Sequence, residues 1–261
     1  MEMLQPFDDF IGNLTLLEIG LIGGTVLLAG FLRGFVGFGA SLIIVMVLSV
    51  ALGPVVAVPV AALSGLPAMF QLLPNAVRYS ERSFVIPFGL ATFVAAPFGT
   101  WILVSLEPAI MKMSISLFVL AMVAMLYRGW RLAQHPSPAA LFAAGAGAGL
   151  VQGAAGVGGP PAVAVALSTA GSAQQQRANV IGTVTALSVC TLLPMWYHGL
   201  FTHDVIIASL LIFPLYAGAT WLGARFFTQR GQRHFRNAAL GALAAIGAVT
   251  LALAVRDYGA G

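Results

Sequence analysis

Two short stretches rich in glycine carry the residue types that could bind a small anion: GFVGFGAS at 34–41 and GAAGVGGPP at 153–161. Each interrupts a long apolar run. Glycine lets the chain turn with positive φ and approach a ligand closely. A helix that begins after such a turn has unpaired N–H groups and a positive dipole end, which together bind anions through the backbone alone. The two stretches therefore predict an anion site built from two helix starts.

Polar side chains accompany both stretches. Arg33 precedes the first, and Gln152 holds the equivalent position before the second. An arginine within a membrane is costly and is a functional candidate, so Arg33 could be the fixed positive charge of an anion path. It could equally reach the membrane interface or cap the turn of its own element. Asn179 and Thr183 could replace water around an anion, or could bond neighbouring helices to one another. The candidate substrate-contacting residues are Arg33, Gly37, Phe38, Gly39, Ala40, Ser41, Gln152, Gly156, Val157, Gly158, Gly159, Asn179 and Thr183.

Two outer glycine pairs have a competing explanation. Gly30 and Gly34 are separated by three residues, as are Gly149 and Gly153. This small-x-x-x-small spacing is typical of membrane helices that pack closely. The sequence leaves helix packing and anion binding open for these four residues.

The composition places the candidate residues in membrane helices. Of the 261 residues, 59% are hydrophobic and 8% are charged, whereas a soluble domain carries about 25% charged residues. Uncharged runs such as 34–77, 136–176 and 237–255 reach the length of a spanning helix, about 20 residues. They lack the alternation of β-barrel strands. We therefore expect an all-α polytopic membrane protein. The net charge is +4. The basic residues sit in short loops between apolar runs, a placement that orients membrane proteins and does not suggest binding of nucleic acid.

No pattern predicts an enzyme or a cofactor. The single cysteine, Cys190, can form no internal disulfide and no cysteine-based metal cluster. The carboxylates lie near predicted helix ends or loops, so the apolar runs contain no cluster typical of a metal site. No nucleotide-binding motif is present, and the N-terminus lacks the basic residues of a cleaved signal peptide.

The chain also repeats itself. AGFLRGFVGFGAS at 29–41 resembles AGLVQGAAGVGGP at 148–160, an offset of 119 residues, and GTWI at 99–102 resembles ATWL at 219–222. We expect an N-terminal repeat, 1–131, and a C-terminal repeat, 132–261, that form one transport domain with the site where they meet. Each repeat would hold a broken element and three spans. The expected broken elements are 16–51 and 139–170, and the expected spans are 55–77, 83–104, 110–128, 176–198, 204–225 and 236–255.

The basic residues favour broken elements that turn back. Arg33 lies inside a broken element and is left out of the count. If each element crosses the membrane once, the remaining basic residues divide five to six between the two sides. If each turns back, nine lie on one side and only Lys112 and Arg256 on the other, as the positive-inside rule favours. As one helix, 16–51 would be about 54 Å long, against a hydrocarbon core of about 30 Å. We therefore expect two re-entrant or broken hairpins in inverted repeats, with both termini extracytoplasmic.

The glycine stretches resemble the repeated element of the TauE/SafE family of sulfite exporters, and the resemblance covers nearly the whole chain. The family element reads G-x-G-G followed by a small or apolar residue. GVGGP at 156–160 is similar to it, whereas GFGAS at 37–41 departs at Ala40. The resemblance implies a multi-pass transporter of sulfite or organosulfonate anions in the plasma (inner) membrane of a prokaryote.

No carboxylate stands in mid-span to carry a proton or sodium ion. The membrane potential alone drives an anion outward by about 2.3 kcal/mol per charge per 100 mV. We therefore expect uncoupled export by alternating access. The alternatives are a channel or importer for another small anion, such as thiosulfate or a carboxylate, and a membrane protein with no transport role. The expected partners are the anion and the lipid bilayer, and a homodimer through the small-residue faces is an open option.

Overall fold

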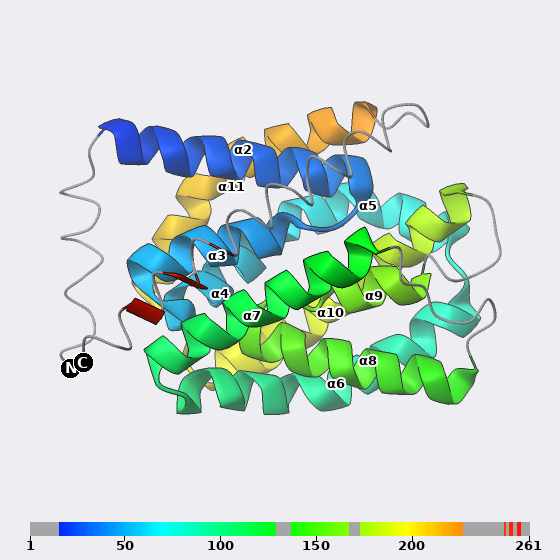
Figure 1. Cartoon of the computed structure of the whole chain (residues 1–261). Coiled ribbons are helices and arrows are strands. Elements are labelled where there is room, and N and C mark those ends of the chain that lie inside the picture. The colour runs from blue at the N-terminus through cyan, green and yellow to red at the C-terminus, as the bar shows by residue number, and fades with distance from the viewer. Residues whose placement is uncertain are drawn as a thin grey trace.

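The computed structural model describes residues 16–128, 137–166 and 173–226, together with 248, 251–252 and 255–256 (Figure 1). Every regular element in these ranges is a helix. The all-α fold is confirmed. The helices are α2 (Leu16–Val36), α3 (Ala40–Leu52), α4 (Pro54–Ser64), α5 (Leu66–Tyr79), α6 (Arg82–Ser105), α7 (Pro108–Tyr127), α8 (Pro138–Ala155), α9 (Gly159–Ala166), α10 (Ala173–Tyr197) and α11 (His203–Arg225).

Several of these helices are long and apolar enough to cross a membrane. Their outward surface is apolar too, since Phe93, Phe98 and Trp101 of α6 are each more than half exposed. Large exposed apolar patches are unusual on soluble proteins and suit contact with lipid. The expected polytopic membrane protein is thus confirmed, although the last expected span, 236–255, lies almost wholly outside the described residues. The candidate spans are Pro54–Pro74, Arg82–Ser105, Pro138–Ala155, Gln174–Tyr197 and His203–Arg225.

The span expected at 55–77 consists of two helices, α4 and α5. Gly65 joins them with helical backbone angles, φ −75° and ψ −16°, so the chain keeps its general direction. Pro67 follows in the first turn of α5 and has no N–H to donate to the preceding turn. The interruption thus falls where a glycine and a residue without an N–H lie close together.

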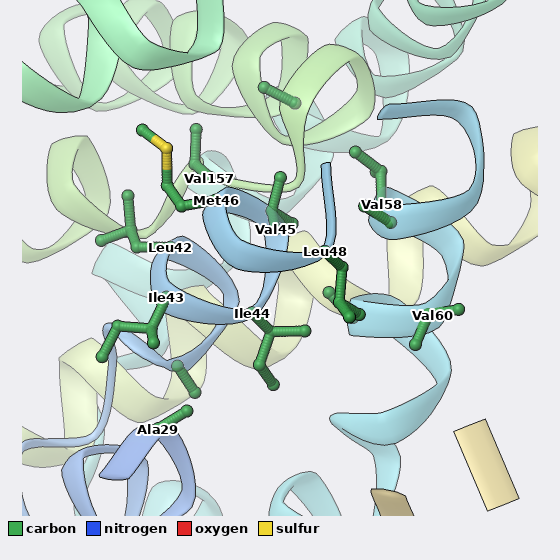
Figure 2. Close-up of a cluster of buried hydrophobic side chains, with 14 of the residues drawn as sticks. Ala29, Leu42, Ile43, Ile44, Val45, Met46, Leu48, Val58, Val60 and Val157 are labelled. Atoms are coloured by element: carbon green, nitrogen blue, oxygen red, sulfur yellow. The ribbon is translucent and has the colours of Figure 1, made fainter. Parts of the chain in front are cut away.

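Both broken elements turn back on themselves. α3 returns beside α2, and Figure 2 shows Ala29 of α2 next to Ile43 and Ile44 of α3 within one buried cluster. After α8, a methyl group added at Gly158 would overlap the carbonyl oxygen of Ala148, which lies about two turns before the end of α8. Only a reversed chain brings these residues together. The breaks fall at 37–39 and 156–158, where the glycine pattern predicts them.

The two halves interlock through the outer glycines. α2 packs along α11, and α8 packs along α6. A methyl group at Gly34 would overlap the carbonyl oxygen of Thr220, and one at Gly153 would overlap that of Ala96. These glycines therefore serve helix packing inside the chain and are not available as a dimer face. A homodimer remains a prediction that needs another surface.

The predicted boundary at 131/132 lies outside the described residues, and the inverted relation of the halves remains a prediction.

Several helix ends meet at one end of the bundle. Arg177, near the start of α10, donates to the carbonyl oxygen of Gly34 at 2.8 Å, near the end of α2. Glu81, in the turn between α5 and α6, accepts a hydrogen bond from the amide of Gln175 at 2.8 Å. The contact of Gly34 with Thr220 places the end of α11 there too. We call this the arginine end, because it carries Arg78, Arg82, Arg177 and Arg225.

Candidate functional site

Positive φ angles shape the turns of both broken elements. Gly37 and Gly39 each have a φ of 97°, and Gly156 has a φ of 67°. L side chains rarely adopt these angles, so glycine is required at these three positions. α3 begins directly after Gly39, and no side chain caps its N-terminus.

Close packing explains glycine at position 158 but not at position 159. A Cβ atom at Gly158 would lie 2.8 Å from the Cβ atom of Gln152, so Gly158 permits a close approach to α8. A Cβ atom at Gly159 would lie 3.9 Å from that of Phe38, which is ordinary contact. Ala40 is the counterpart of Gly159 in the other repeat, and both begin a helix. Alanine at position 40, where the family element has glycine, therefore requires no shift of the neighbouring backbone.

The two turns enclose a small cavity, which we call the central cavity. The α2–α3 turn, the α8–α9 turn and the middle of α10 form its walls. Its volume is about 10 Å³, close to the least space that holds one water molecule. The lining residues are Arg33, Phe38, Gly39, Ser41, Leu42, Gln152, Gly156, Val157, Gly159, Pro160, Val184 and Ser188.

Arg33 is the charged residue of this cavity. Its side chain is only 5% exposed, and its Nη1 donates to the carbonyl oxygen of Gly37 at 3.0 Å. No carboxylate of the described residues pairs with it. Arg33 thus caps the turn of its own element, as one interpretation expected, and also lines the cavity, as an anion path would need.

Gln152 plays the equivalent part in the second half. Its Oε1 accepts a hydrogen bond from the N–H of Gly158 at 2.9 Å. The start of α9 therefore has few donors left, because Pro160 and Pro161 have no N–H. The two expected helix starts therefore differ in the number of N–H groups that they leave for an anion.

The free backbone donors come from α3. The first backbone hydrogen bond at its start runs from the N–H of Ile43 to the carbonyl oxygen of Gly39, at 3.4 Å. The N–H groups of Ala40, Ser41 and Leu42 precede it and have no partner within the helix. They lie at the positive end of the helix dipole, next to the cavity that Arg33 lines.

Other candidates lie outside the cavity lining. Gly37 faces α10, where an added methyl group would lie 3.2 Å from Ile181. Asn179 accepts a hydrogen bond from the N–H of Glu81 at 2.8 Å, and the Thr183 hydroxyl donates to the carbonyl oxygen of Asn179 at 2.8 Å. The bond of Asn179 ties α10 to the start of α6, as the structural alternative expected, whereas the bond of Thr183 stays within α10. Substrate contact by either residue stays a prediction. Ala40 and Gly158 complete the two turns.

Sequence reasoning missed four lining residues: Leu42, Pro160, Val184 and Ser188. Leu42 and Pro160 adjoin the glycine stretches, which could have identified them. Val184 and Ser188 lie four residues apart on α10, and the hydroxyl of Ser188 donates to the carbonyl oxygen of Val184 at 2.9 Å. Nothing local separates them from other residues of an apolar helix.

The fold and the cavity define a polytopic helical membrane protein in which two interrupted elements meet at a buried cationic site. Residues 22–250 match the family described as Sulfite exporter TauE/SafE. The chain belongs to the TauE/SafE family, and it is a membrane transporter of sulfur-containing anions rather than an enzyme. No significant match was found among curated proteins or among solved structures.

Proposed function

We propose that this protein exports a small sulfur-containing anion, sulfite or an organosulfonate, by alternating access through the central cavity. The observation that carries the proposal is Arg33, which is buried in the cavity with no carboxylate partner among the described residues. Burial of such a charge costs several kcal/mol. A bound anion would supply the missing counter-charge.

The chemistry around Arg33 suits an oxyanion. Arginine binds oxyanions through two parallel N–H···O bonds, and the N–H groups at the start of α3 add neutral donors. The oxygen atoms of sulfite accept hydrogen bonds and donate none when fully ionised. A cation would meet Arg33 with no compensating carboxylate in the lining.

The arginine end is proposed to face the cytoplasm. Arg78, Arg82, Arg177 and Arg225 gather there, whereas Lys112 lies near the start of α7, after α6 has run to the other end. The positive-inside rule then places the start of α2 outside, as expected for two extracytoplasmic termini in a prokaryotic inner membrane. Labelling of a Ser80→Cys variant by an impermeant thiol reagent from outside would contradict this orientation.

Opening to either side would require movement of one turn. The α2–α3 turn packs on Ile181 towards the arginine end. The α8–α9 turn packs on the other side of the cavity, where a methyl group at Gly156 would lie 3.2 Å from Val58 and 3.3 Å from Val45. Since the cavity is so small, an anion would enter only when one turn moves away. Each hairpin would thus gate one side.

The direction of transport follows from the membrane potential. The described carboxylates, Glu18, Glu81, Glu107 and Asp204, all lie in terminal turns or connections of helices. Because none stands in mid-span to couple a cation, the inside-negative potential would drive the anion outward.

Efflux from liposomes tests the proposal. Purified protein is expected to release preloaded radiolabelled sulfite down an applied potential, faster than acetate and without sulfite-dependent proton movement. Preference for thiosulfate or a carboxylate would favour the alternative importer or channel. No sulfite-dependent flux above that of empty liposomes would contradict the proposed function.

A further inference from the structure

A second cavity lies at the arginine end, beside the start of α10. We call it the inner vestibule, and it is lined by Tyr79, Gln174, Arg177, Ala178 and Ile181. Gln174 is exposed, Tyr79 and Arg177 are half-buried, and Ala178 and Ile181 are buried, so the lining leads from the surface into the core. The volume is about 40 Å³, room for a few water molecules. Guanidinium, phenol and amide groups supply donors, and the lining contains no carboxylate.

The inner vestibule and the central cavity lie along one face of α10. Arg177 and Ile181 line the vestibule, and Val184 and Ser188 line the central cavity. Spacings of four, three and four residues put these side chains on the same side of a helix. An anion could therefore pass from one cavity to the other along α10 without crossing to another helix face.

The α2–α3 turn separates the two cavities. Its backbone rests on α10, because a methyl group at Gly37 would lie 3.2 Å from Cγ1 of Ile181. Arg177 also holds this element, since its Nη2 donates to the carbonyl oxygen of Gly34 at 2.8 Å. The contact between Gly37 and Ile181 thus forms a thin barrier, and a vestibule residue is bonded to the element that forms it.

We propose that the inner vestibule is a loading site for the oxyanion, that Arg177 binds the anion there, and that Gly37 and Ile181 form the inner gate. This inference rests on the proposed function. The bond from Arg177 to Gly34 is a single bond to a neutral carbonyl oxygen, whereas an oxyanion opposes the charge of the guanidinium and can accept two parallel N–H···O bonds from it. An anion in the vestibule therefore competes with Gly34 for the guanidinium and loosens the α2–α3 turn from the side on which the anion arrives.

Sulfite transport measured in vesicles of both orientations tests the role of Arg177. Arg177→Gln is expected to raise the KM for sulfite offered at the arginine end by about tenfold, as loss of one charge-assisted hydrogen bond implies. The KM from the opposite end should change little. Arg177→Lys keeps the charge and should restore part of the affinity. An equal loss of maximal rate from both ends with unchanged KM would show a purely structural role and overturn the inference.

A cysteine in the central cavity tests the gate. In a Cys190→Ala background, a charged thiol reagent applied at the arginine end should label Ser188→Cys several times faster after Ile181→Ala. The matched control is Leu193→Ala, which shortens an exposed side chain of the same helix and should leave the labelling rate unchanged. Equal labelling with and without Ile181→Ala would refute the gate.

If the wild type transports sulfite but Arg177→Gln keeps its KM, the loading site fails while the proposed function stands. If the wild type neither binds nor transports sulfite, both fail.

Discussion

Replacement of Arg33 by glutamine is expected to lower sulfite transport by at least about 100-fold while the protein still folds. Hydrogen bonds to charged groups contribute about 1.5–3 kcal/mol each, and every 1.4 kcal/mol is about tenfold in affinity. An arginine that holds an oxyanion through two such bonds therefore accounts for a loss of this size. Glutamine is the residue at the equivalent position, Gln152, so this fold accommodates it beside a turn of the same kind.

The same substitution should abolish sulfite binding without lowering the stability of the protein. Removal of an unpaired buried charge relieves a cost of several kcal/mol, so Arg33→Gln is expected to unfold at the same temperature as the wild type or higher. Sulfite at about 100 times its Kd should stabilise the wild type by about 2.7 kcal/mol and the variant not at all. Thermal unfolding in detergent, with and without sulfite, measures both effects.

The control for Arg33 is Arg82→Gln, which changes an exposed arginine at the start of α6. It should keep both sulfite transport and stabilisation by sulfite. If Arg33→Gln also keeps them, Arg33 is not part of the site.

Gly153→Ala is expected to destabilise the protein by about 3 kcal/mol or more. The added methyl group would overlap the carbonyl oxygen of Ala96 and lie 2.8 Å from the N atom of Thr100 and 3.0 Å from the Cα atom of Gly99. These are backbone atoms, so no side-chain rotation relieves the overlap, and overpacking of this kind costs about 1–3 kcal/mol or more. α8 must then move away from α6, which also stretches the 3.1 Å hydrogen bond from Thr92 to the carbonyl oxygen of Gly145.

The matched control, Gly147→Ala, lies on the same helix. Its added methyl group has no neighbour within 4 Å, and alanine favours helix by up to about 1 kcal/mol over glycine. Gly147→Ala should therefore be neutral or slightly stabilising. Thermal unfolding of both variants in one detergent measures the difference, and equal stability of the two would contradict the packing of α8 on α6.

The sequence was most informative where glycine has a defined backbone role. Gly37, Gly39 and Gly156 predict breaks at the places where the structure has them, because positive φ leaves little choice of residue. Gly34 follows Gly30, and Gly153 follows Gly149, at a spacing that allowed helix packing as one of two explanations. The close approach of Gly34 to Thr220 and of Gly153 to Ala96 shows that packing.

The remaining features depend on contacts between distant segments. Val184 reaches the central cavity only because α10 passes both turns, and an apolar residue in an apolar helix gives no local sign of that. The sequence left Asn179 as either a ligand or a bond between helices, and it gave no sign that the partner would be the N–H of Glu81, which lies far away in the chain. Composition and spacing do not reveal which residues from distant segments contact one another.

The two halves share a scaffold but differ in charge. At equivalent positions Arg33 donates to the turn that follows it, whereas Gln152 accepts from its own turn. The prolines after Gly159 remove further donors from the second half. The proposed site therefore has one fixed charge and one set of free helix-start donors, an arrangement suited to a single anion at a time.

The most direct test of the central cavity is the position of bound selenite, a heavier analogue of sulfite, located by anomalous scattering in crystals of the protein. We predict one ion whose oxygen atoms lie about 2.7–3.2 Å from the guanidinium of Arg33 and from the N–H groups of Ala40 and Ser41. A selenite ion bound elsewhere in the membrane region, with none beside Arg33, would contradict the account.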